Sequence, residues 1–189
     1  MEFKKGDIYG THRVISPKGV LPQPADVIDN TMEIYDNEVL IEVHTLNIDS
    51  ASFTEIERRA EGDIEEIKKI IMNIVETTGK HKNPWTGSGG MLIGKVAAIG
   101  PNFQGDLRVG DKIATLVSLS LTPLVIEEIL EMRPTIDQVD IKGQAILFQS
   151  GIYGIIPDDM PEGLALSALD VAGAPAQAAK LVQSGQKVL

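Results

Sequence analysis

Four glycines fall within residues 87–94, which read GSGGMLIG. Such clusters bind phosphate when a strand precedes them and a helix follows, because the amides at the helix N-terminus then face the anion. Here Asn83-Pro84-Trp85-Thr86 precedes the glycines, and a β-branched run follows them. The order is loop and then strand, so the sequence argues against a nucleotide site. Two explanations remain: a tight turn with close backbone approach, or a site that has lost a side chain.

The other groups that could do chemistry are carboxylates, hydroxyls and three histidines, because the chain has no cysteine. The absence of cysteine excludes disulfides and every thiolate metal site, structural zinc included. The net charge of −10 argues against nucleic acid or an anionic membrane surface as a partner. A cationic substrate is compatible with this charge, although excess acid that simply aids solubility explains it more economically.

Length and composition indicate a folded domain, or one domain plus part of another. The chain has 189 residues, of which 43% are hydrophobic and 23% charged, as in ordinary globular domains. No apolar run approaches the ~20 residues that a membrane span requires. The N-terminus has no apolar segment behind its charged residues, so we expect a cytoplasmic protein.

Several elements must position these groups. Short strands with irregular connections are predicted for the first ~45 residues, ending in the β-rich run Glu38–His44. Between Gly62 and Gly79, isoleucines and Val75 recur at intervals of three and four, which predicts a helix with one apolar face. Asp63 and Glu66 form a plausible capping pair for this helix, and Gly79 is its expected end.

The second half of the chain mixes strand and helix patterns. Strands are predicted for 91–99, 112–117 and 144–148, and a second helix for Leu124–Met132, closed by Pro134. Leu164–Val182 is predicted to be an Ala-rich helix disturbed by Gly173 and Pro175. Residues 184–189 have the pattern of a turn and the start of a strand, so we expect the chain to be the front part of a longer protein.

Three stretches resemble, in their order, the GroES-like catalytic domain of the medium-chain dehydrogenases/reductases. That family carries Gly-His-Glu, then a strand with G-x-V-x-x-x-G, then V-G-D-x-V; here residues 87–89 read GSG, 94–100 read GKVAAIG and 107–113 read LRVGDKI. The resemblance implies mixed β structure with peripheral α: a GroES-like, partly open β-barrel over 1–157. It also implies a connecting helix and the first strand of a truncated Rossmann cofactor domain over 158–189.

Further stretches resemble an amine-oxidising branch of this superfamily that acts in lysine fermentation. They are residues 9–14, 46–54, 86–94, 114–123 and 169–177. This resemblance implies oxidative deamination of the β-amine of a small cationic diamino acid, with NAD or NADP as cofactor and release of ammonium. It implies that the missing C-terminal part binds most of the cofactor, that this fragment alone is inactive, and that the full-length protein is a homo-oligomer.

This sequence departs from the family pattern at the positions that bind the catalytic zinc. Zinc-dependent members bind the catalytic metal with Cys, His and Cys; matching the motifs places the first Cys at Asp49, the His at Ser88 and the following Glu at Gly89. The other Cys falls near Ser167, or at Asp170 with a short gap. One carboxylate with hydroxyls is a poor zinc site, and the structural zinc lobe of four cysteines is also missing. We therefore predict a metal-free site without zinc.

Amine oxidation needs no Lewis acid, because a base that removes the ammonium proton frees the nitrogen lone pair to expel hydride. Asp49 is the candidate catalytic group that holds the ammonium and accepts its proton; its alternative role is capping the turn after a strand. Asp170, the second catalytic candidate, lies on an apolar helix and needs a partner. That partner is either the substrate ammonium or a structural hydrogen bond.

The sequence also offers residues to line a substrate pocket and carry protons. The substrate-binding candidates are Ser50, Ser52, Glu55 and Ser88. A solvated surface is the alternative for Glu55. His12 and His44 are either proton carriers or structural residues, and His81, beside Lys80 and Lys82, is predicted to lie in an exposed loop.

Two other functions stay open at this point: a zinc-free, quinone-reductase-like enzyme that reduces an enone with NADPH, and a non-catalytic GroES-like binding module. Asp49 and Asp170 facing one cleft would favour the amine enzyme. An apolar cleft would favour the reductase, and acids exposed on separate faces would favour the module. The helix over 62–79 is either a lid, an oligomer contact or a surface helix with one buried face.

Overall fold

An open antiparallel sheet forms the centre of the computed structural model, which describes residues 3–171 and 173–187, except the side chains of Ser167, Asp170 and Val171. The strand order is β6-β7-β3-β4-β5-β8, with β6 and β8 as unpaired edges, so the sheet does not close into a complete barrel. Its strands are β3 (Val39–Ile48), β4 (Gly90–Ile99), β5 (Lys112–Thr115), β6 (Leu124–Arg133), β7 (Gln138–Leu147) and β8 (Tyr153–Ile155). The expectation of mixed, partly open β structure with peripheral helices is confirmed.

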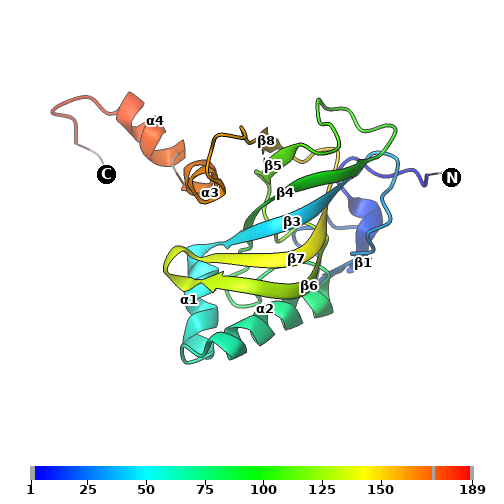
Figure 1. Ribbon diagram of the computed structural model, residues 1–189, viewed down its shortest axis with the longest axis horizontal. Helices are drawn as coiled ribbons and strands as arrows, with labels where there is room; N and C mark the ends of the chain where they lie inside the picture. Colours follow the sequence, from blue (N-terminus) through cyan, green and yellow to red (C-terminus); the bar gives the residue numbers. More distant parts are fainter. Residues whose placement is uncertain (1–2, 172, 188–189) are drawn as a thin grey trace.

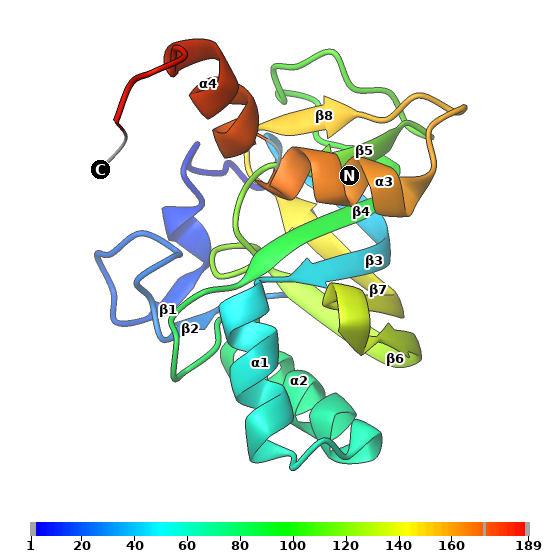
Figure 2. The same ribbon diagram turned by 90° about the vertical axis from the view of Figure 1, so that its left-hand side faces the viewer.

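The helices lie at two ends of the sheet. They are α1 (Ser50–Arg59), α2 (Ile64–Thr78), α3 (Glu162–Val171) and α4 (Gly173–Leu181). Figures 1 and 2 show α1 and α2 together below the sheet, with α3 at the opposite end beside β4 and β5. In Figure 1, α4 projects from the body of the molecule toward the C-terminus.

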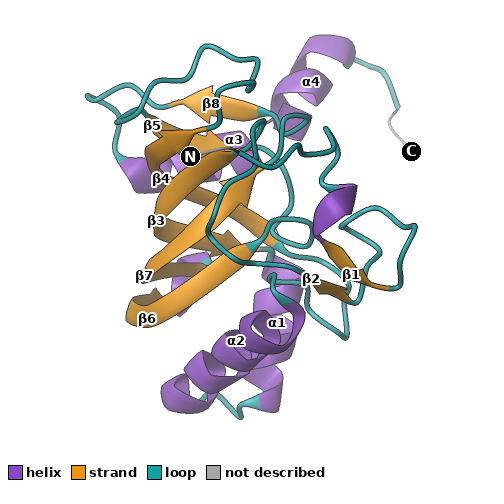
Figure 3. Ribbon diagram, turned by 90° about the vertical axis from the view of Figure 1, so that its right-hand side faces the viewer, coloured by secondary structure: helices purple, strands orange, loops and turns teal. Residues whose placement is uncertain are grey.

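The N-terminal segment forms a small unit beside the main sheet. It contains the 3-10 turn η1 (Thr11–Arg13) and a two-stranded sheet of β1 (Val14–Ser16) and β2 (Val27–Ile28). Figure 3 shows these two strands apart from the central strands, close to α1 and α2. The Nζ of Lys80, a fully buried residue just after α2, donates to the carbonyl oxygens of Pro22 (2.5 Å), Gln23 (3.2 Å) and Ala25 (2.7 Å). Lys80 therefore ties the N-terminal segment to the end of α2.

The hydrophobic core lies between the sheet and the helix pair α1 and α2. Ile41, Leu46 and Ile48 of β3 are fully buried, and Phe53 and Ile56 of α1 pack in the same cluster. On α2 the buried residues are Ile67, Ile71, Ile74 and Val75, which confirms the predicted apolar face. Each such side chain contributes about 1.5–3 kcal/mol relative to an exposed position. This core fixes where β3 ends and α1 begins.

The ends of α2 follow from local chemistry, as the sequence predicted. The Asp63 carboxylate accepts hydrogen bonds from the amides of Glu65 (2.8 Å) and Glu66 (3.0 Å). Gly79 ends the helix with φ +78° and donates its amide to the Val75 carbonyl at 2.8 Å. A Cβ at Gly79 would overlap the carbonyl oxygen of Ile28, so glycine is required there for both conformation and space.

We expect Asp63→Ala to lower the free energy of unfolding by about 1 kcal/mol, because two amides of the first turn lose their acceptor. Urea denaturation followed by circular dichroism measures this change. The matched control is Glu76→Ala, an exposed change in the last turn of the same helix, which should cause no loss. Equal stability of Asp63→Ala and the wild type would contradict the capping role.

The helix predicted for Leu124–Met132 is wrong, because this segment is most of strand β6. Its Leu, Glu and Met residues favour helices, but β6 pairs with β7 from Leu124–Ala145 to Arg133–Gln138. Pro134 begins the 3-10 turn η2 (Pro134–Ile136) that leads into β7, rather than closing a helix. Long-range pairing overrides local propensity here.

Other boundaries also differ from the prediction. The strand expected over 144–148 is the second half of the longer β7, and α1 was not predicted at all. The Ala-rich segment forms two helices, α3 and α4, on either side of residue 172, which lies outside the described residues. The strand predicted at the end of the chain extends into residues 188–189, which also lie outside them.

Candidate functional site

Asp49 lies where β3, α1 and β4 meet. It follows the last residue of β3 and is the N-cap of α1, with its carboxylate accepting from the amide of Ala51 at 3.1 Å. Its own amide donates to the carbonyl of Gly89 at 3.2 Å, beside the pairing of Ile48 with Gly90. The structure thus brings Asp49 and the glycine-rich loop together.

Close packing explains two of the glycines in that loop. A Cβ at Gly89 would lie 2.5 Å from the amide nitrogen of Ser120 and 2.9 Å from both Ser118 Oγ and the His81 carbonyl oxygen. Gly90 has φ +123°, and a Cβ there would overlap the carbonyl oxygen of Asn47. Because no side chain fits at either position, the structure supports a tight backbone approach as the reason for these glycines.

Three hydroxyls form a closed cluster beside the loop. Ser52 Oγ lies 2.8 Å from Ser88 Oγ and 2.9 Å from Thr86 Oγ1, and the last two atoms are 2.9 Å apart. Asn83 adds a hydrogen bond from its Nδ2 to the Ser52 carbonyl at 3.1 Å. The predicted residues Ser52 and Ser88 are therefore in contact, and they fasten the loop to α1.

A cleft of about 260 Å³ opens beside Asp49. Its lining residues are Asp49, Gly90, Met91, Leu116, Val117, Ser118 and Leu169. Asp49 and Ser118 supply the polar side chains of this lining, and Leu169 comes from α3. Asp170 also belongs to α3, but its side chain lies outside the described residues.

A second, largely apolar cavity of about 280 Å³ shares Val117 with this cleft. Tyr9 and Leu21 of the N-terminal segment line it together with Leu121 and Phe148. A polar cleft next to an apolar cavity suits a small molecule that has charged groups and a short hydrocarbon part. Ser118 and Thr86 of the hydroxyl cluster were not among the predicted site residues. The resemblance over 86–94 and 114–123 was the signal that could have found them.

None of the four predicted substrate-binding residues is in this cleft lining: Ser52 and Ser88 belong to the hydroxyl cluster, and Ser50 and Glu55 lie elsewhere on α1. Ser50 is the exposed first residue of α1. Glu55 pairs with Arg58 and Arg59, both at 2.8 Å. Hydrogen bonds from Arg58, opposed by partial burial and reinforced by Arg59, lower the pKa of Glu55 to about 2. Arg59 in turn stacks on Trp85, with 3.7 Å between Cζ and the ring centroid, which ties α1 to the loop once more.

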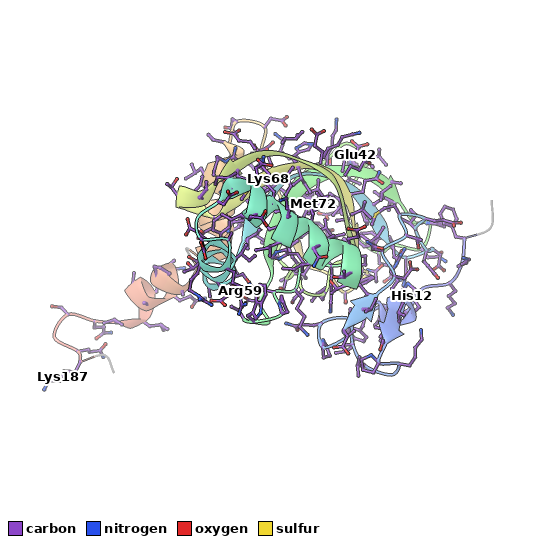
Figure 4. All side chains as sticks on the ribbon, turned by 90° about the horizontal axis from the view of Figure 1, so that it is seen from below. His12, Glu42, Arg59, Lys68, Met72 and Lys187 are labelled. Carbon is purple, nitrogen blue, oxygen red and sulfur yellow. The ribbon has the colours of Figure 1, made fainter. Side chains whose placement is uncertain are left out.

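The histidines His12 and His44 are bound elsewhere. His12 Nδ1 accepts from the amide of Asp7 at 2.9 Å, so Nε2 carries the hydrogen that it shares with Glu38 at 2.9 Å. Figure 4 shows His12 in the N-terminal unit, away from Arg59 of α1. His44 faces Glu162 at 3.8 Å. Neither histidine lines the cleft beside Asp49.

The prediction that His81 lies in an exposed loop is wrong, because this residue is completely buried. Just after α2, the buried Lys80 donates a hydrogen bond from Nζ to the Ala25 carbonyl. The next residue, His81, packs its carbonyl against Gly89. Long-range contacts of the backbone, and not the polarity of the neighbouring lysines, set the burial of His81.

Among the side chains that the structure describes, which leave out that of Asp170, no three from His, Asp or Glu are arranged to hold a metal ion. None of the helices described has the length and apolar character needed to cross a bilayer.

Comparison with known proteins gives consistent matches. Residues 12–157 match the family described as L-erythro-3,5-diaminohexanoate dehydrogenase N-terminal domain. The chain is 66% identical over 188 residues to L-erythro-3,5-diaminohexanoate dehydrogenase of Fusobacterium nucleatum, and 63% identical over 187 residues to that of Acetoanaerobium sticklandii. Each match covers 98% of this chain and 54% of the relative, so the chain spans about half the length of these curated relatives.

Proposed function

The chain belongs to the L-erythro-3,5-diaminohexanoate dehydrogenase N-terminal domain family, and on this basis we propose that it is the N-terminal catalytic domain of such an enzyme. The reaction is NAD(P)-dependent oxidative deamination of L-erythro-3,5-diaminohexanoate to 5-amino-3-oxohexanoate and ammonium, without zinc. The structural observation that carries this proposal is Asp49, between β3 and α1, in a cleft that β4, residues 116–118 and α3 also line.

Asp49 binds the substrate ammonium and takes its proton. Opposite charges at a protein surface attract each other more strongly than in bulk water, so the carboxylate favours a cationic substrate. The cofactor supplies the hydride acceptor. Loss of the proton to Asp49 leaves a neutral amine, whose lone pair forms the C=N bond as the hydride leaves carbon 3. Water then adds to the iminium carbon, and ammonia departs to leave the ketone.

The glycine loop does not fit the pyrophosphate of a dinucleotide. Gly89 is packed against Ser118, Ser120 and His81, and a strand follows the loop instead of a helix. A phosphate site of the usual type needs free amides at a helix N-terminus. We therefore propose that a part of the enzyme other than residues 1–189 binds most of the cofactor.

We assign residues 1–157 to a GroES-like catalytic domain and 158–189 to the connection and first strand of the cofactor domain. Asp170 remains a second candidate for the substrate ammonium. The full-length enzyme is proposed to be a cytoplasmic homo-oligomer of the medium-chain dehydrogenase/reductase superfamily that acts in lysine degradation.

The test is an assay of the full-length protein with 3,5-diaminohexanoate and either NAD or NADP. We expect NADH or NADPH and ammonium to form in equal amounts, because each turnover removes one hydride and one amine. The 3-hydroxy analogue is the control, since a site without a Lewis acid should not oxidise an alcohol efficiently. Reduction of an enone by NADPH, without amine oxidation, would instead support the quinone-reductase-like function.

A further inference from the structure

His81 is a buried polar side chain that the proposed reaction does not use. Its exposed fraction is 0%, and within the described part of the chain neither ring nitrogen makes a well-formed hydrogen bond. Burial lowers the pKa of His81 to about 4, although the nearby carbonyls of Gly89 and of His81 itself act in the opposite direction. The neutral ring therefore has one donor and one acceptor that are not satisfied, which destabilises a folded protein.

The position of His81 connects it to Asp49 through one residue. The His81 carbonyl oxygen packs against Gly89, and the backbone of Gly89 also acts on the His81 ring, where it favours the protonated form. The Gly89 carbonyl accepts the amide of Asp49 at 3.2 Å. A movement of the His81 ring would thus act directly on the carbonyl that holds the backbone of Asp49.

The loop around His81 is fixed on both sides. Lys80 is held by three carbonyl oxygens of the N-terminal segment, and Asn83 by the Ser52 carbonyl and by its amide contact with the Ser88 carbonyl at 2.9 Å. These contacts fix the backbone on both sides of His81, whose ring is fully buried. It keeps its place behind Gly89.

We propose that His81 is a positioning residue for Asp49, with its ring N–H directed to the Gly89 carbonyl so that the Asp49 carboxylate faces the cleft. This inference rests on the proposed function, because it takes Asp49 as the group that binds and deprotonates the amine. Hydrogen bonds that support catalysis are often poorly aligned in the free enzyme and tighten when substrate binds. The unsatisfied ring is retained for this purpose although it weakens the fold.

The test is His81→Leu in the full-length protein, with His81→Gln as the variant that keeps an N–H donor. A purely structural histidine with unsatisfied nitrogens should be replaceable by leucine without loss of activity. We expect His81→Leu to melt at an equal temperature or a few degrees higher and to lose kcat roughly 10- to 100-fold. KM should change little, and His81→Gln should recover part of kcat.

Asp49→Asn is measured in parallel to separate the two proposals. If Asp49→Asn keeps full activity, the proposed function of Asp49 fails, and this inference fails with it. If Asp49→Asn is impaired while His81→Leu has normal kcat, only the role of His81 is overturned. If His81→Leu does not fold, His81→Gln becomes the deciding variant. A stable His81→Gln protein with more than half of the wild-type kcat supports the positioning role of His81. A stable but inactive His81→Gln protein contradicts it.

Discussion

Asp49→Asn in the full-length protein is expected to lower kcat/KM for 3,5-diaminohexanoate by about 10²- to 10⁴-fold, the usual effect of removing a general base. Asparagine has nearly the shape of aspartate and is as good an N-cap. The hydrogen bond to the Ala51 amide is therefore kept. What is lost is the negative charge that holds the ammonium and the oxygen that accepts its proton.

The matched control is Asp63→Asn, the same change at the N-cap of α2. Asp63 is exposed and does not line the cleft, so kcat/KM should stay at the wild-type value. Initial rates of NADH or NADPH formation measure both variants, and circular dichroism checks their fold. Full activity of Asp49→Asn would remove this carboxylate from the mechanism.

Sequence reasoning succeeded where the deciding contacts are local. Asp63 and Gly79 mark the ends of α2 because their effects act within one helical turn. The apolar spacing of the same segment gave its buried face. The strand after the glycine loop was also found from its β-branched residues and became β4.

Sequence reasoning failed where contacts with distant parts of the chain decide the local structure. Leu124–Arg133 is a strand because β7 pairs with it along its length, and nothing within the segment indicates this partner. His81 is buried because Lys80 reaches the carbonyls of residues 22–25, more than fifty positions away in the sequence. Local polarity gave the opposite expectation.

The candidate site falls between these cases. The proximity of Asp49 to Gly89 was expected from the order of motifs shared with a known superfamily, and not from spacing or periodicity. The hydroxyls of Thr86 and Ser118 belong to loops, where no periodic pattern marks inward-facing side chains. Their contacts had to be read from the folded arrangement.

The largest effect on stability is expected for Glu38→Gln, which breaks a buried ion pair. Arg13 donates from Nε to Glu38 Oε1 at 2.7 Å and from Nη2 to Oε2 at 2.6 Å, with both side chains at most 1% exposed. The amide of Tyr35 and the ring of His12 also bond to this carboxylate. Glutamine keeps the size of the side chain but removes the carboxylate charge, so the buried Arg13 retains only the more distant Asp29, whose Oδ2 lies 3.7 Å from Nη1, among its acidic partners described here.

We expect Glu38→Gln to lower the free energy of unfolding by about 3–5 kcal/mol, the effect of removing one partner from a buried pair. Urea denaturation measures this value. Glu42→Gln is the control, because Glu42 is an exposed residue of β3, labelled in Figure 4. Its replacement should change stability by less than about 0.5 kcal/mol.

The pH dependence separates loss of charge from loss of packing at Glu38. Burial would raise the pKa of Glu38, but hydrogen bonds from Arg13 and His12 and the charge of Arg13 hold it below the ordinary value of 4.5. A carboxylate with a lowered pKa in the folded state stabilises fully above its unfolded pKa, and this stabilisation disappears as the pH falls through the folded pKa. The stability gap between wild type and Glu38→Gln should therefore narrow in acid. A gap that stays constant from neutral pH to below pH 4.5 would show that glutamine disturbs packing and that the charge of Glu38 contributes little to holding the N-terminal unit.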